Sequence, residues 1–151
     1  MDRMPTDRPA PPPPPPSAAL LEAQGWTRPT TSNFLDHVGP VWTRTESGRL
    51  RMGVVVEEKH DNTQGRSHGG MIMTLCDEGM GRAAQAARAG ERLFTVGFEC
   101  QFIAGARHGE FMEVHCEVVR STASLVFMRS TCFVGDRVVA TAAGIWKVLS
   151  R

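Results

Sequence analysis

Hydrophobic and polar positions along this chain follow two different periods. Between residues 49 and 57 they alternate strictly, and the apolar set is Leu50, Met52, Val54 and Val56. Successive side chains of a strand point to opposite faces, so this alternation predicts a strand with one buried face. The polar stretch 58–67 that follows is predicted to be a loop.

From residue 70 to residue 89 the apolar positions recur every three or four residues, which predicts a long helix that stops at Gly90. Its apolar stripe is broad and contains small residues, comprising Met71, Ile72, Leu75, Cys76, Gly79, Met80 and Ala83. Such a stripe indicates a central helix that other elements wrap. Two shorter helices are predicted before it, over residues 18–24 with Ser17 as the cap and over residues 34–38.

Four more strands are predicted after the long helix, over residues 95–102, 111–120, 124–134 and 137–147. Gly135-Asp136 separates the last two, and glycine at the first turn position suits a type II′ hairpin. Sequential strands with short connections are expected to be antiparallel neighbours, because a parallel crossover needs about a dozen residues. The predicted fold class is therefore α+β, with one long helix against an antiparallel sheet of five to six strands.

The first sixteen residues differ in composition from the rest. They hold eight of the ten prolines, including the unbroken run Pro11–Pro16, which favours an extended polyproline II segment. We expect residues 1–16 to be a disordered leader. What remains of the 151-residue chain is enough for one ordinary domain and too little for two.

Charge and composition exclude several classes of function. Lys and Arg number 17 against 16 Asp and Glu, so little counterion release is available for binding nucleic acid. No apolar run approaches the roughly 20 residues that cross a bilayer, and the N-terminus lacks the apolar segment of a secretory signal. Four widely spaced cysteines in apolar runs are predicted to be reduced core residues: Cys76, Cys100, Cys116 and Cys132. We therefore expect a cytoplasmic protein without nucleic-acid or membrane partners.

Candidate chemistry concentrates where the predicted loop becomes the long helix. Gly69-Gly70 allows a ligand to approach backbone N–H groups that the first helical turn leaves unpaired. Together with the helix dipole, such donors stabilise a carbonyl oxygen that becomes negative, as in an oxyanion hole. The alternative is that the two glycines only relieve crowding in a tight turn.

Two carboxylates follow within this helix, Asp77 and Glu78. An acidic residue two turns into an apolar helix must be solvated, paired or functional, and small residues flank Asp77 at Thr74 and Gly81, where a cleft can open. Glu78 lies about 100° further round the helix, so the two carboxylates are not expected to share a face. Spacing alone does not choose between them.

The histidines permit a second chemistry. His60 and His68 lie in the same loop and would suit a metal ion, but no third convergent ligand can be named, so no metal is predicted. Ser67 and His68 are sequence neighbours whose side chains diverge, which argues against a serine nucleophile activated by histidine.

The run from Asn62 through His68-Gly69-Gly70 to Asp77 resembles the signature of the hotdog-fold acyl-CoA thioesterases of the PaaI (phenylacetic acid degradation) type. Flanking segments are similar too, namely Phe34 to Pro40, Thr95 to Phe98 and Gly135 to Ala140. The resemblance implies a hotdog domain over residues 33–151, in which a sheet wraps a long central helix. Residues 17–32 then form a short helix and linker ahead of it.

The resemblance also implies roles for individual residues. The N–H of Gly69 is expected to hold the thioester carbonyl oxygen, and Asp77 is expected to activate water as a general base or to act as the nucleophile. Asn62 and His68 are expected to position water and the loop, and Thr95 to add a hydroxyl. Asp77 is expected to reach the site from the neighbouring subunit.

The expected substrate is an acyl-CoA with an aryl or a medium- to long-chain fatty acyl group, so coenzyme A is part of the substrate and no separate cofactor is expected. Contacts to coenzyme A are expected at Gly70, Phe102, Ala104 and Arg120. The stretch Phe102-Ile103-Ala104-Gly105 departs from the family, in which many members carry a basic residue and a proline there. Arg107 and Arg120 are the candidates for phosphate contacts.

Assembly follows from the same resemblance. The strand over residues 95–102 is expected to pair with its symmetry mate, giving a homodimer or homotetramer with shared sites. Methionines on the helix, Met71, Met73 and Met80, are expected to tolerate varied acyl groups or simply to fill the core. The competing hypothesis is a non-catalytic acyl-CoA-binding or regulatory module, against which an intact Asp77 argues.

Overall fold

The computed structural model describes residues 14–31 and 33–149. Its elements are α1 (Ala18–Ala23), α2 (Phe34–Val38), β1 (Val41–Glu46), β2 (Arg49–Val55), the 3-10 helix η1 (Glu58–His60), α3 (Gly69–Ala87), β3 (Leu93–Phe102), β4 (Phe111–Ser121), β5 (Leu125–Val134) and β6 (Arg137–Val148). The predicted leader falls mostly outside the described residues, and Pro14 to Pro16 have no regular secondary structure. No helix in the described ranges is long and apolar enough to cross a bilayer.

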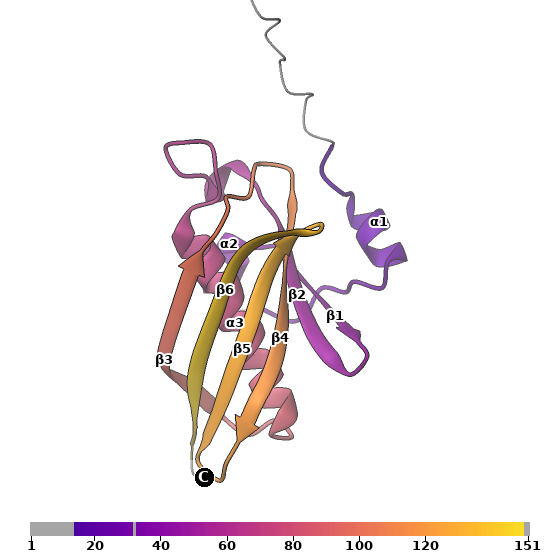
Figure 1. The fold of residues 1–151 in the computed structure, drawn as a ribbon. Helices are drawn as coiled ribbons and strands as arrows, with labels where there is room; N and C mark the ends of the chain where they lie inside the picture. The colour runs from indigo at the N-terminus through magenta and orange to yellow at the C-terminus, as the bar shows by residue number, and fades with distance from the viewer. Residues whose placement is uncertain (1–13, 32, 150–151) are drawn as a thin grey trace, which may run out of the picture.

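The six strands form one antiparallel sheet in the order β1-β2-β4-β5-β6-β3, and α3 lies against one face of it (Figure 1). The predicted α+β class with a long central helix is confirmed. The predicted hairpin is also present, because Val134 pairs with Arg137 across Gly135-Asp136 and Gly135 has a φ of 55°. Only the first of these two turn residues has a positive φ, as in a type II′ turn.

The strand β1 was not expected from the sequence. It pairs with β2 through a two-residue turn in which Ser47 has a φ of 50° and Gly48 a φ of 74°. Two positive φ values define a type I′ turn, which usually carries asparagine, aspartate or glycine at its first position. Because Ser47 occupies that position, the sequence did not indicate a hairpin there.

The expectation that sequential strands are neighbours is wrong for β3 and β4. The chain leaves β3 at Phe102 and enters β4 on the far side of β5 and β6, while β3 pairs with β6. Residues 103–110 thus span the top of two strands instead of closing a hairpin. As a result, β3 lies at a free edge of the sheet, opposite the edge formed by β1 (Figure 1).

The helix α3 begins one residue earlier than predicted and ends two residues earlier. His68 is its N-cap and accepts the N–H of Gly70 through Nδ1 at 2.9 Å, so the first turn already includes Gly69. After Arg88, the C-cap, Ala89 and Gly90 have φ values of 51° and 82°. This left-handed backbone cannot continue a right-handed helix.

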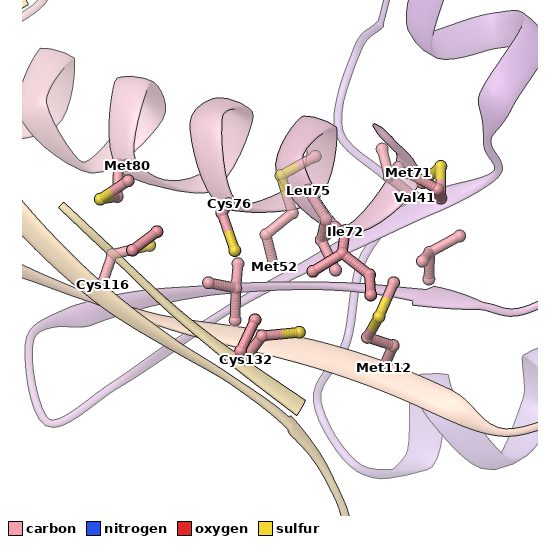
Figure 2. Packing of buried hydrophobic residues seen from close by; sticks show 14 of the residues in the cluster. Val41, Met52, Met71, Ile72, Leu75, Cys76, Met80, Met112, Cys116 and Cys132 are labelled. Carbon is pink, nitrogen blue, oxygen red and sulfur yellow. The ribbon is translucent and has the colours of Figure 1, made fainter. Parts of the chain in front are cut away.

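The main core lies between α3 and the sheet. Met52, Val54 and Val56 are fully buried, which confirms the alternating pattern of the second strand. Figure 2 shows Cys76 and Met80 directed from α3 toward the strands, where Cys132 and Met112 lie. Met71 and Met80 are core residues, whereas Met73 is 39% exposed, so these methionines do not form one shared acyl-binding surface.

The four cysteines are free, as predicted. Cys76, Cys116 and Cys132 are buried in the main core, while Cys100 is only half-buried because it lies on the edge strand β3. Burial raises the pKa of the Cys100 thiol to about 11, so it remains protonated at neutral pH.

A second, smaller core covers the other face of the sheet. The segment containing α1 packs Leu21 and Trp26 against Trp42 of β1. The ring of Trp26 meets Phe111 edge to face, with centroids 5.0 Å apart, and the guanidinium of Arg44 lies 4.7 Å from the Trp26 ring centroid. Figure 1 shows α1 beside β1 and β2, away from the free edge at β3.

Candidate functional site

The loop ahead of α3 is shaped by Asn62. Its side-chain oxygen accepts the N–H groups of Gln64 at 2.8 Å and Arg66 at 3.2 Å, and its own N–H donates to the carbonyl of Arg66 at 2.6 Å. A bridge between Asp61 and Ser67 closes the loop just outside these contacts. Asn62 was expected to position water and the loop, and these contacts hold the loop.

His60, which the sequence suggested only as a possible metal ligand, is a structural residue. Its ring is buried, accepts the N–H of Glu57 through Nδ1 at 2.9 Å, and donates from Nε2 to the carbonyl of Val38 at 2.6 Å. Burial lowers the pKa of His60 below its usual value. Both nitrogens are therefore committed to the backbone, and within the described ranges no cluster of three metal-ligating side chains exists.

The start of α3 presents one backbone donor. The N–H of Gly70 is taken by the ring of His68, and the N–H groups of Met71 and Ile72 reach the carbonyl of His68 at 2.9 and 3.3 Å. Among the described residues, none accepts a hydrogen bond from the N–H of Gly69. His68 therefore serves as the helix cap and leaves Gly69 as the free donor of the first turn.

Phe102, at the end of β3, borders this donor. A Cβ added to Gly69 would lie 3.1 Å from Cζ of Phe102, so glycine allows the ring to lie close to the helix start. The ring is 53% exposed. Ala104, another predicted contact, follows in a turn where the N–H groups of Ile103 and Ala104 both reach the carbonyl of Val139, at 2.9 and 3.0 Å.

Asp77 is bonded to Thr95. The Oγ1 of Thr95 on β3 donates to Oδ1 of Asp77 at 2.9 Å, which directs this carboxylate toward the free edge of the sheet. The pair borders a hollow of about 310 Å³, with walls from α3, β3 and Trp146 of β6. This contact between two predicted site residues could not be read from the sequence, because it depends on how β3 lies across α3.

Glu78 occupies the same hollow, which corrects the expectation that the two carboxylates do not share a face. The hollow is wide enough to reach around the helix, since Gly81, Arg82 and Gln85 also line it. Glu78 pairs with Arg82 one turn later, with Nε and Oε2 3.6 Å apart. Burial raises the pKa of Glu78 above its usual value.

The structure does not bring all predicted residues together within one subunit. Gly69 and Asp77 are eight residues apart on α3, which corresponds to about 12 Å along the helix axis. Arg120 lies near the other end of α3, because the next residue, Ser121, is 3.5 Å from the guanidinium of Arg88. Within one chain, the free donor at Gly69 and the carboxylate of Asp77 thus lie at two separate places.

A long helix packed against one face of a six-stranded antiparallel sheet is the architecture of the hotdog fold. A model of the Thioesterase superfamily matches residues 64–141. A Pseudomonas aeruginosa protein named "Putative esterase PA0474" is 35% identical over 118 residues, which cover 77% of this chain and 88% of that protein. The chain therefore belongs to the Thioesterase superfamily and is an enzyme of that class.

Solved structures share the fold at low sequence identity. Thioesterase superfamily member 2 from zebrafish has a TM-score of 0.72 and 21% identity, and the match covers 79% of this chain and 88% of the zebrafish chain. The PaaI protein of Escherichia coli has a TM-score of 0.71 and 13% identity, covering 78% and 86%. A Streptococcus mutans protein solved with acetyl CoA has a TM-score of 0.65 and 22% identity, covering 72% and 88%. The predicted hotdog thioesterase resemblance is confirmed.

Proposed function

We propose that this enzyme hydrolyses an acyl-CoA to a carboxylic acid and free coenzyme A, with Asp77 as the general base. The observation that carries the proposal is the hydrogen bond from Thr95 to Asp77 at the edge of an open hollow. That bond holds one carboxylate oxygen in place and leaves the other for a water molecule. The acetyl CoA bound to the Streptococcus mutans neighbour supports coenzyme A as the thiol carrier.

The proposed reaction needs few groups. Asp77 accepts a proton from water while the water oxygen forms a bond to the thioester carbon, and the N–H of Gly69 stabilises the negative charge that develops on the carbonyl oxygen. The carbon–sulfur bond then breaks, and the thiolate of coenzyme A leaves and takes up a proton. A thiolate leaves readily without prior protonation, so no strong general acid is required.

We propose that Gly69 and Asp77 belong to two half-sites that are joined in a homodimer. The donor at Gly69 and the base at Asp77 lie too far apart on one helix to act on the same thioester. The free edge strand β3 carries Thr95 and exposes Val96, and an unpaired strand edge readily pairs with another chain. Pairing of β3 with the β3 of a second subunit brings the Asp77 end of one chain toward the Gly69 end of the other, and further association to a tetramer is compatible with this arrangement.

The direct test measures thiol release from a panel of aryl- and fatty-acyl-CoAs by wild type and by Asp77→Asn, which keeps the shape of the side chain and removes the base. We expect the variant to lose at least about a hundredfold in kcat, with little change in KM. Equal rates for the two proteins on every substrate would refute the enzymatic role of Asp77. Acyl-CoA binding without hydrolysis would instead support the non-catalytic alternative.

A hybrid experiment tests the shared site. Asp77→Asn subunits are mixed with Gly69→Pro subunits, which lack the helix-start N–H, after reversible dissociation. A heterodimer then contains one site with an intact Asp77 from one chain and an intact Gly69 from the other. We expect activity that neither parent shows. An inactive mixture that contains heterodimers, or an active monomer on a sizing column, contradicts the proposed arrangement.

The location of the protein stays a prediction. Four free cysteines fit a reducing compartment, because oxidising compartments favour disulfides. We therefore propose that this enzyme acts in the cytoplasm.

A further inference from the structure

A basic cluster lies beside the helix-start donor, in the connection between β3 and β4. The side chain of Arg66 lies across Gly105, where an added Cβ would be 3.0 Å from Cδ and 3.4 Å from Cγ of the arginine. Gly105 thus provides the space through which the aliphatic part of Arg66 runs. The absence of a side chain at residue 105 is what determines the course of this arginine.

The backbone of Arg66 is fixed from both sides. Asn62 binds its N–H and its carbonyl group, as described above, and the N–H of Ser67 donates to the carbonyl of Ala106 at 2.7 Å. This last bond joins the loop before α3 to the β3–β4 connection, next to Arg66 in the loop and Arg107 in the connection. The backbone of Arg66 is therefore held in a defined position, and Gly105 leaves room for the aliphatic part of its side chain.

A third arginine secures the same connection. Arg137 donates from Nη1 to the carbonyl of Gly105, and its Nη2 contacts both carboxylate oxygens of Glu110 at 2.8 and 2.7 Å. Glu110 also accepts the N–H of Arg107 at 2.7 Å. Glu110 is thereby fully engaged, and it neutralises Arg137 but not the other two guanidinium groups.

Arg66 keeps its donors available. Among the residues that the structure describes, no carboxylate forms an ion pair with Arg66 or Arg107, and this includes Asp61 across the neighbouring bridge to Ser67. Arg66 is half-buried, and a guanidinium with free donors is suited to a phosphate group, which it can bind through two parallel hydrogen bonds. The region therefore carries an excess of positive charge next to the proposed thioester site.

We propose that Arg66, placed by Gly105 and Asn62, binds a phosphate group of the coenzyme A substrate. This inference rests on the proposed acyl-CoA function. A thioester whose carbonyl oxygen lies at the N–H of Gly69 has its pantetheine arm free to run past the exposed ring of Phe102 toward Gly105. Arg66 is only three residues from Gly69, so the backbone separation is at most about 10 Å, within reach of the extended arm. Arg120, at the far end of the same subunit, has no such path within one chain.

The experiment compares three substrates that carry the same acyl group: acyl-CoA, acyl-dephospho-CoA, which lacks the 3′-phosphate, and acyl-pantetheine, which lacks every phosphate. We expect Arg66→Ala to raise KM for acyl-CoA about tenfold, with kcat and the KM for acyl-pantetheine unchanged. Arg66→Lys keeps the charge and should recover part of the loss. If Arg66→Ala leaves the KM for acyl-dephospho-CoA unchanged, Arg66 binds the 3′-phosphate. If the variant raises this KM as it does for acyl-CoA, Arg66 binds the diphosphate.

Two further variants separate placement from charge. Gly105→Ala leaves Arg66 present and shifts its side chain only slightly, so any rise in KM for acyl-CoA should be much smaller than in Arg66→Ala, and acyl-pantetheine should be unaffected. Arg129→Ala removes an exposed arginine of β5 and serves as the control with no expected change. The proposal is overturned if Arg66→Ala leaves KM for acyl-CoA unchanged, or if it raises the KM of acyl-pantetheine equally.

Direct binding distinguishes a failure of this inference from a failure of the proposed function. Calorimetric titration of wild type and Arg66→Ala with free coenzyme A requires no turnover. If no substrate is hydrolysed but wild type binds coenzyme A about tenfold more tightly than the variant, the phosphate site stands and the enzymatic proposal fails. Equal affinities in the two proteins refute the phosphate site, whatever the activity.

Discussion

Replacing Gly69 with proline removes the proposed oxyanion donor and almost nothing else. Gly69 is the first residue of α3, a position where proline is well tolerated because its missing N–H has no partner within the helix. The preceding residue, His68, has φ −60° and ψ 140°, which is the extended conformation that a following proline requires. We therefore expect the free energy of unfolding to change by less than about 1 kcal/mol.

The effect on catalysis should be much larger than the effect on stability. The other N–H groups of the first turn are engaged by His68, so the loss at Gly69 is the loss of the whole donor. Loss of one oxyanion donor typically lowers kcat by about 10²–10³, or about 2.7–4 kcal/mol of transition-state stabilisation. Steady-state thiol release with a saturating acyl-CoA measures this, and urea unfolding measures the stability.

Gly69→Ala is the matched control. It introduces the same Cβ, which would lie 3.1 Å from Phe102, but it keeps the N–H. Half of the Phe102 ring is exposed and can shift slightly, so we expect only a small loss of activity in this variant. If Gly69→Pro folds and its kcat lies within about threefold of that of Gly69→Ala, the carbonyl oxygen is not held by this N–H, and Gly69 is not the oxyanion donor.

Two further predictions concern Thr95 and His60. Thr95→Val removes the hydroxyl that is bonded to Asp77 at 2.9 Å, and a hydrogen bond to a charged group contributes about 1.5–3 kcal/mol. We therefore expect kcat/KM to fall at least about tenfold in this variant, while Thr95→Ser stays near wild type. Equal kcat/KM values for the valine and serine variants would show that the hydroxyl is dispensable. Burial lowers the pKa of His60 in the folded state. As the pH falls below about 6.5, His60 is therefore protonated in the unfolded chain before it is protonated in the folded protein, and the free energy of unfolding decreases. Thermal unfolding at pH 7.5 and 5.5 should show a smaller loss for His60→Gln than for wild type, and parallel losses would exclude His60 as the cause.

The elements with strong periodicity were predicted well from the sequence. The stripe along α3 and the alternation around Met52 and Val54 reflect burial against a single core, and burial imposes its period directly on the residue types. The strand β1 was missed because it is short, only its first two residues are buried, and its turn begins with Ser47. The position of β3 beside β6 was also missed, because local connections carry no information about which edge a strand joins.

The candidate site was predicted as a set of residues but not as an arrangement. The motif from Asn62 to Asp77 pointed to the start of one helix and to one carboxylate, and the glycine pair indicated a backbone donor. Spacing left the choice between Asp77 and Glu78 open, and our proposal of Asp77 as the base is supported by its bond to Thr95 on β3 and by the pairing of Glu78 with Arg82. The roles of His60 and Arg66 depend on contacts with Val38 and Gly105, residues far away in the sequence.

By itself, the sequence determined the fold class, the long central helix and the chemistry available at its start, because hydrophobic periodicity and helix capping act over a few neighbouring residues. The eight-residue spacing of Gly69 and Asp77 along one helix also followed from the sequence. Only the tertiary structure decided that β3 lies at a free edge and that Thr95 meets Asp77. These features depend on the packing of elements distant in sequence, and the separation along one rigid helix is the physical reason for proposing a second subunit.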